Sequence, residues 1–196
     1  PRIAFDHFGV MANTRPTLSP LDQVVRLRDI VIYRLCAGFP QRSLISSFYT
    51  PPLCSPDVKV IPPLLRDEVF DVSSSDGEHI LVYFNNGAHT FTKTLEHEFN
   101  ACGIPMKVYG TGREACTQDN LEFKAPSNEG FLADLASCRA VISTAGNQLI
   151  GETLYFQKPV LVAPEGCVEQ RMNANALAAL GVGEALIDVP LTRDRI

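Results

Sequence analysis

From His79 onward, apolar runs alternate with segments of helical periodicity. The runs that predict strands are Ile80–Phe84, Met106–Tyr109, Leu121–Phe123, Ala140–Ser143, Pro159–Ala163 and Ala185–Ile187. Between them, apolar residues recur three and four positions apart and predict helices over about 91–102, from about Asn128, over Gln148–Gln157 and over Glu169–Leu180. Strands that alternate with helices are typical of βαβ units. We therefore predict an α/β fold with a Rossmann-like parallel sheet flanked by helices.

The first part of the chain has a less regular pattern, interrupted by prolines. Short apolar runs at Arg2–Asp6, Ser43–Phe48 and Val58–Ile61 predict strands, and Leu21–Leu35 predicts a helix. A polar stretch, Val72–Glu78, then reads as a linker. We predict the end of a partial second α/β domain over 1–71, a linker over 72–78 and, over 79–196, a sheet domain that lacks its last helices. Because Pro1 leads straight into a strand and no helix closes the chain, we expect both ends to be internal to a longer protein.

Composition and charge narrow the possible partners. Hydrophobic residues make up 45% and charged residues 20% of the chain, as in an ordinary packed protein. The formal net charge is −5 and no Lys/Arg cluster is present, so nucleic acid is disfavoured as a partner. An anionic ligand must instead be held by helix N-termini and single arginines.

The cysteines and the absence of long apolar runs bear on the compartment. The six cysteines form no CxxC pair or zinc-binding spacing, which favours reduced thiols. The sequence shows no signal peptide and no apolar run long enough to span a bilayer. We expect a cytoplasmic protein, and peripheral contact with the inner face of the membrane stays open.

Three predicted turns fall at the edge of the sheet where parallel strands end. They are Asn85–Gly87, Thr144–Asn147 and Pro164–Gln170. Ligands of open parallel sheets bind at this edge, where helix N-termini point outward. Gly87 and Gly146 would let the backbone approach a phosphate, although each would also suit a plain tight turn. No GxGxxG fingerprint occurs, which disfavours a nicotinamide dinucleotide.

Two polar residues follow these turns and have two interpretations each. Glu152 lies in the early turns of a predicted helix, where its carboxylate could accept hydrogen bonds from both hydroxyls of a ribose, or could simply be solvated. Gln170 opens the next helix and could either bind sugar hydroxyls or lie on the surface.

Together these segments form a more specific combination. Ser143–Glu152, Lys158–Pro164 and Glu169–Ala174 place a small-Gly turn, a helix glutamate, a strand next to a proline and a Gln-x-x-Asn-Ala helix in succession. The combination resembles the donor-site signature of MurG-like inverting glycosyltransferases, which have two facing Rossmann-like domains (the GT-B fold). The resemblance is strong from 79 to 183. Pro62–Arg66 resembles the family's interdomain junction.

The resemblance implies a role for each matching residue. Glu152 would bind the ribose of the donor, and Gln170 its sugar. The implied diphosphate-binding positions are Asn86, Gly87, Gly146 and Asn147, with Arg66 as a positive group, and backbone near Phe123 and Lys124 would bind the base. Asp6 and His7 would lie on the acceptor side, as the local candidates for a general base.

The implied activity is transfer of a hexosyl group from a uridine-diphosphate (UDP) sugar, by an inverting mechanism that needs no metal and no cofactor. The acceptor stays open, with lipid-linked molecules and glycans as the candidates, and the isolated chain would bind the donor better than it turns it over. Two features differ from the family: Asn85–Gly87 is less glycine-rich, and Glu169 precedes Gln170, which leaves the sugar open. A nucleotide-sugar hydrolase or epimerase, and a binding module without catalysis, are the alternatives.

Overall fold

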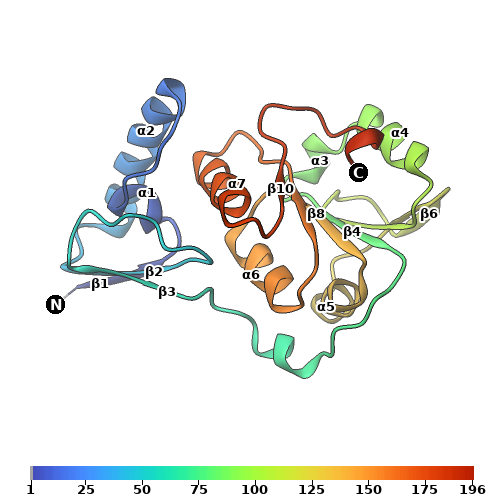
Figure 1. The fold of residues 1–196 in the computed structure, drawn as a ribbon, viewed down its shortest axis with the longest axis horizontal. Helices are drawn as coiled ribbons and strands as arrows, with labels where there is room; N and C mark the ends of the chain where they lie inside the picture. Colours follow the sequence, from blue (N-terminus) through green and yellow to red (C-terminus); the bar gives the residue numbers. More distant parts are fainter. Residues whose placement is uncertain (1) are drawn as a thin grey trace.

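The computed structural model describes residues 2–196, so Pro1, at the start of the first predicted domain, lies outside it. The described chain forms two β-sheets with helices packed against them (Figure 1). A three-stranded sheet has the order β1-β2-β3, and a seven-stranded sheet has the order β10-β9-β8-β4-β5-β7-β6. All strand pairs are parallel except β6 with β7. The predicted α/β class with a parallel sheet flanked by helices is confirmed.

The large sheet follows the predicted alternation closely. Its strands are β4 (Ile80–Tyr83), β5 (Met106–Tyr109), β6 (Cys116–Gln118), β7 (Leu121–Phe123), β8 (Ala140–Ser143), β9 (Val160–Val162) and β10 (Glu184–Ala185). Its helices are α3 (Gly87–Thr90), α4 (Lys93–Cys102), α5 (Asn128–Ser137), α6 (Asn147–Tyr155) and α7 (Val168–Leu180). The antiparallel strand β6 was not predicted, because its short polar sequence carries no apolar alternation.

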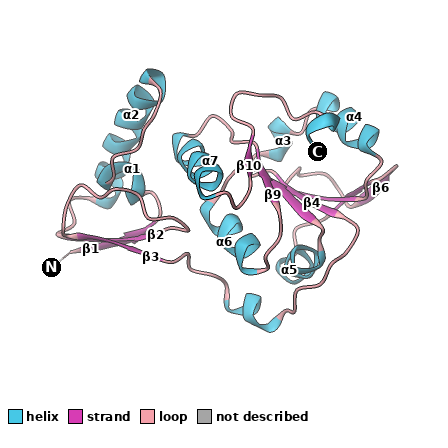
Figure 2. Cartoon of the chain, viewed as in Figure 1, coloured by secondary structure: helices cyan, strands magenta, loops and turns pink. Residues whose placement is uncertain are grey.

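Apolar residues on alternate positions of the central strands build one core on each face of this sheet. Leu81 and Val141 face α5, α6 and α7 together with Leu135, Ile150 and Leu177. On the other face, Val82, Val108 and Phe123 pack with Phe91 of the α3–α4 turn and Phe99 of α4. Figure 2 shows the same layers, with helices on both sides of the strands. Both faces of a parallel sheet are buried in this way when helices form the crossovers.

The strand order reverses at β4, which determines where a ligand can bind. β4 pairs with β5 on one side and with β8 on the other, so the chain leaves β4 in one direction and later returns past it. In register, Tyr83 at the end of β4 lies opposite Ser143 at the end of β8. Such a switch point opens a crevice at the carboxyl ends of the strands. The site described below lies there.

The small sheet consists of β1 (Ile3–Asp6), β2 (Arg42–Ser46) and β3 (Val58–Ile61). Helix α1 (Gly9–Asn13) packs on this sheet, and α2 (Pro20–Ala37) packs against α1 and α7. Its core contains Val10, Ile45 and Val58, together with Val168 and Met172 of α7. Helix α7 therefore packs into the cores of both sheets. The predicted division into 1–71, 72–78 and 79–196 stays a prediction.

The segment between the sheets crosses from β3 to β4 with one short 3-10 helix, η1 (Asp67–Asp71). The predicted linker, 72–78, contains no regular element. At the carboxyl end the chain forms a second 3-10 helix, η2 (Arg193–Arg195), which contacts α4. Among residues 2–196, no helix is both long and apolar enough to cross a membrane.

Candidate functional site

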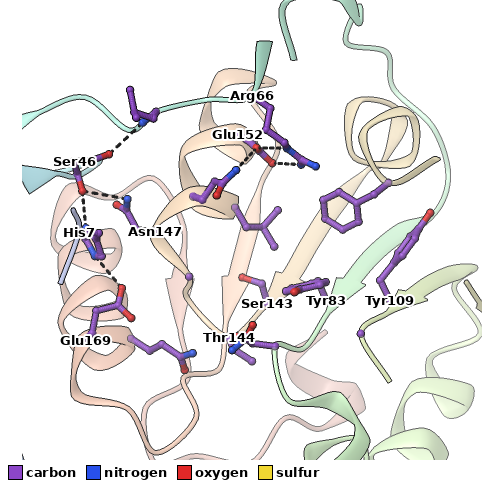
Figure 3. Close-up of a pocket in the computed structure, with 18 of the residues that line it drawn as sticks. His7, Ser46, Arg66, Tyr83, Tyr109, Ser143, Thr144, Asn147, Glu152 and Glu169 are labelled. Carbon is purple, nitrogen blue, oxygen red and sulfur yellow. Dashed lines mark hydrogen bonds and ion pairs between the residues drawn. The ribbon is translucent and has the colours of Figure 1, made fainter. Parts of the chain in front are cut away.

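A cavity of about 790 Å³ lies at the switch point, between the two sheets. The small sheet contributes the loop that follows β1 and the end of β2, while the large sheet contributes the ends of β4, β5 and β8 and the first turns of α5, α6 and α7. Most of the sequence-predicted site residues line it, namely Asp6, His7, Arg66, Gly146, Asn147, Glu152 and Gln170. Figure 3 shows the side chains that face this cavity.

The corner between β8 and α6 is conformationally unusual. Ala145 has a φ of 69°, a left-handed conformation that residues other than glycine rarely adopt, and its side chain is fully buried. Asn173 of α7 donates a hydrogen bond to the carbonyl of Ala145. A Cβ atom built on Gly146 would meet nothing within 4 Å, so this glycine borders open space. The packing here buries Ala145 but leaves Gly146 accessible.

Of the three helices whose first turns line the cavity, α6 and α7 have no side-chain cap, whereas α5 has one. Ser19, Thr92 and Ser127 cap α2, α4 and α5 by accepting hydrogen bonds from backbone N–H groups. No side chain caps α6 or α7. The first N–H groups of a helix have no partner within the helix, and they carry the positive end of its dipole. An anion in the cavity would find these donors unused.

Glu152 is the buried acid of the site. Its side chain is 1% exposed, and Arg66 donates to both of its carboxylate oxygens, at 2.8 and 2.6 Å. Gln148, one turn earlier in α6, donates to the same carboxylate at 3.2 Å. The guanidinium of Arg66 also lies 5.7 Å from the ring centre of Phe131. Arg66 was expected beside the diphosphate, but in the structure its guanidinium is directed at the carboxylate of Glu152.

Asn147 and Gln170 are both buried and both hydrogen-bonded to the backbone. Asn147 donates to the carbonyl of Ser46 and accepts from the N–H of Phe48, which joins α6 to the end of β2. Gln170 accepts from the N–H of Glu165 and so fixes the loop before α7. The NH₂ group of Gln170 has no such bond to Glu165 and is available to the cavity.

The two candidate bases differ in what they contact. Asp6 accepts hydrogen bonds from the N–H of Gly9 at 2.5 Å and from the hydroxyl of Tyr33 at 3.1 Å. His7 places Nδ1 at 2.6 Å from the carbonyl of Ser46 and Nε2 at 2.8 Å from Glu169. Asp6 also lines a second cavity of about 480 Å³, beside α2. It therefore lies where the two cavities meet.

Four sequence-predicted positions are not among the residues that line the cavity. Asn85 lines it in place of Asn86. Gly87 is required by packing, because a Cβ atom there would lie 2.6 Å from the carbonyl of Gly110, and it opens a helix of only four residues. Phe123 is 1% exposed in the core, and Lys124 pairs with Glu122 at 3.0 Å.

Sequence reasoning missed an aromatic wall on the large-sheet side of the cavity. Phe131 makes edge contacts with Tyr83 and Tyr109, with ring centres 5.7 and 5.0 Å apart. Tyr109 also donates to Asp134 at 2.6 Å, which with burial raises the pKa of its phenol well above the ordinary value. Tyr83 and Tyr109 end their strands, so the rule that ligands bind at carboxyl ends could have identified them.

The comparison with protein families decides the wider assignment. The family described as "Glycosyl transferase family 1" matches residues 3–196, nearly the whole chain. The chain belongs to this family. No curated protein matches it in sequence.

Solved structures show the same fold for glycosyltransferases. The glycotransferase of kitacinnamycin has a TM-score of 0.62 at 17% identity, covering 88% of this chain and 51% of that one. The corresponding values are 0.61, 16%, 90% and 50% for LpCGTa in complex with UDP, and 0.54, 15%, 91% and 50% for VinC in complex with dTDP. This family 1 chain thus spans about half the length of those proteins. The closer likeness to MurG stays a prediction.

Proposed function

We propose that the protein is a MurG-like glycosyltransferase that transfers a hexosyl group from a UDP-sugar with inversion. The observation that carries the proposal is one cavity at the sheet switch point, faced by two uncapped helices and by the buried carboxylate of Glu152. Two of the solved neighbours are named as complexes with UDP and dTDP, which supports a nucleoside diphosphate as the ligand. The family assignment supports glycosyl transfer as the reaction.

The charges of the cavity suit a departing diphosphate. In glycosyl transfer, negative charge grows on the leaving phosphate while the sugar passes through an oxocarbenium-like state. Helix N-termini that already point at this position stabilise the charge without rearrangement. The proposed path for the diphosphate runs past Gly146, where the packing leaves space for it, toward the start of α7.

Glu152 and Gln170 would position the two sugars of the donor. A carboxylate can accept from both hydroxyls of a ribose, and Glu152 lines the cavity within the first two turns of α6. Its lone pairs are largely occupied by Arg66 and Gln148, so a ribose has to share or displace one of these donors. The free NH₂ group of Gln170 would donate to a hydroxyl of the transferred sugar.

Asp6 is the better of the two candidates for general base. Its carboxylate lies between the two cavities, and an ionised carboxylate keeps lone pairs free after accepting two hydrogen bonds. The ring nitrogens of His7 both face acceptors, so His7 offers no lone pair to the proton of an acceptor hydroxyl. Asp6 would accept this proton as the hydroxyl oxygen bonds to the anomeric carbon and the bond to UDP breaks.

Product analysis with UDP-hexoses separates transfer from the alternatives. The chain is incubated with each donor, with and without lipid-linked and glycan acceptors, and Asp6→Asn provides the matched variant. Transfer predicts a glycosylated acceptor of inverted configuration and little UDP released without acceptor. Free sugar or an epimer formed without acceptor would instead show a hydrolase or an epimerase. Donor binding without any product would leave a binding module.

A further inference from the structure

His7 connects the two sheets at the edge of the cavity through a cluster that the proposed reaction does not use. It follows β1 and lies between Ser46 at the end of β2 and Glu169 in the first turn of α7 (Figure 3). Asn173, one turn later in α7, also contacts the ring. The side chains of His7 and Glu169 are 13% and 9% exposed. A buried and fully bonded ring of this kind has its protonation state determined by its partners.

Every partner of the His7 ring accepts hydrogen bonds. Nδ1 lies 2.6 Å from the carbonyl of Ser46, which can only accept. Nε2 lies 2.8 Å from the carboxylate of Glu169 and 3.2 Å from Oδ1 of Asn173. The NH₂ group of Asn173 donates to Glu169 and to the carbonyl of Ala145, which leaves Oδ1 as the atom that faces His7. In a neutral ring, one nitrogen would direct its lone pair at an acceptor. In an imidazolium, both nitrogens carry protons and donate to the acceptors that face them.

We propose that His7 is a positioning residue which, as an imidazolium, clamps the start of α7 against the small sheet and so holds the donor-binding turn in place. Glu169 precedes Gln170, and Asn173 bonds the strained corner at Ala145, so both walls of the cavity are tied to this ring. Val168 and Met172, on the neighbouring face of α7, pack into the core of the small sheet beside it. The choice of ligand in this inference rests on the proposed function, but the protonation state of His7 does not.

The electrostatic surroundings of His7 agree with the geometry. Burial alone lowers the pKa of the ring, but the hydrogen bond and ion pair with Glu169, with help from Ser46 and Asn173, raise it above the ordinary value of 6.5. The other titratable groups beside Glu169 are Tyr49, after β2, and Cys167, before α7. Burial raises the pKa of each, so both stay neutral at neutral pH. Asp6, which directly precedes His7 in the sequence, accepts hydrogen bonds from Gly9 and Tyr33 instead.

The protonation state is measured directly by following the ring nitrogens of His7 by ¹⁵N NMR as a function of pH, in the whole chain without ligand. Both nitrogens should carry protons at pH 6.5, and the midpoint should lie above 6.5, the ordinary value. Glu169→Gln removes the charge at nearly constant shape and should lower this midpoint. A titration midpoint at or below the ordinary value of 6.5 would overturn the inference. So would a ring nitrogen that carries no proton at pH values below 6.5.

The positioning role is measured by calorimetric titration with UDP across the same pH range. Wild type should lose affinity as pH rises through the midpoint of His7. His7→Gln, which cannot donate from both ends, should bind about tenfold more weakly at low pH, the worth of about one charge-assisted hydrogen bond, and lose the pH dependence. His97→Gln, on an exposed part of α4, is the control. If His7→Gln binds UDP like wild type, the positioning role is wrong. If wild type does not bind UDP, the proposed donor fails, while the NMR result still decides the protonation state.

Discussion

The guanidinium of Arg66 donates from Nε and Nη2 to the two carboxylate oxygens of Glu152, at 2.8 and 2.6 Å. Arg66 comes from the segment between the two sheets, and Glu152 from the helix that follows the switch point. The side chain of Arg66 is 25% exposed and that of Glu152 is 1% exposed. The pair therefore attaches the connecting segment to α6 at the cavity.

Removing Arg66 should destabilise the fold, because Glu152 would keep a buried charge without its partner. For Arg66→Ala we expect a loss of about 1–3 kcal/mol in the free energy of unfolding, below the range for fully buried pairs because Arg66 is partly exposed. Denaturant titration measures this loss. Arg28→Ala, in the exposed pair with Asp29, should change stability by less than about 1 kcal/mol. Equal effects of the two variants would contradict the importance of the pair.

Glu152→Gln tests the ribose contact. We expect affinity for UDP to fall by roughly 1–3 kcal/mol, the worth of hydrogen bonds to a charged acceptor. Calorimetry with 2′,3′-dideoxy-UDP provides the control, since this ligand lacks the hydroxyls that the carboxylate would accept. Wild type should discriminate against the dideoxy ligand more strongly than Glu152→Gln, whose amide oxygen still accepts a hydrogen bond but carries no charge. Equal discrimination by both proteins would remove Glu152 from the ribose site.

Alanine substitutions at Gly87 and Gly146 distinguish a glycine required by packing from one that leaves space for a ligand. Gly87→Ala places a methyl group against the carbonyl of Gly110 and should cost about 1–3 kcal/mol of stability. Gly146→Ala meets nothing within 4 Å, so stability should stay nearly the same. Its methyl group would instead lie in the proposed diphosphate path and weaken UDP binding by about 1.4 kcal/mol, or tenfold. A Gly146→Ala variant with full affinity would move the diphosphate elsewhere.

Those two glycines show how far the sequence alone reaches. Both follow a strand and look alike in sequence, so both were predicted to line a diphosphate. The structure separates them because Gly87 meets the backbone of Gly110, a contact between distant segments that no local pattern encodes.

Except for β6 and α3, the strands and helices of the large sheet were predictable, since apolar periodicity and caps such as Ser127 act locally. The Arg66–Glu152 pair, whose members lie 86 positions apart, and the clamp at His7 depend on how the two sheets pack. The aromatic wall depends on packing too, although the position of Tyr83 and Tyr109 at the carboxyl ends of their predicted strands indicated that they lie near a ligand site.

The ion pair of His7 with Glu169 should make stability depend on pH. Because the pKa of His7 in the fold is raised above 6.5, its contribution is complete below that value and is lost as pH rises through the folded-state pKa. The difference in unfolding free energy between wild type and His7→Gln isolates this contribution from His79, whose pKa burial lowers. This difference should shrink as pH rises. A difference that grows with pH would contradict the raised pKa.

The proposed function depends on UDP occupying the cavity at the switch point. Calorimetric titration of the folded chain with UDP, repeated with Glu152→Ala, tests this most directly. We expect saturable binding at one site per chain, weakened by roughly 1–3 kcal/mol in the variant. Absence of binding to a chain that is demonstrably folded, or equal affinity for both proteins, would contradict a nucleotide-sugar site built on these residues.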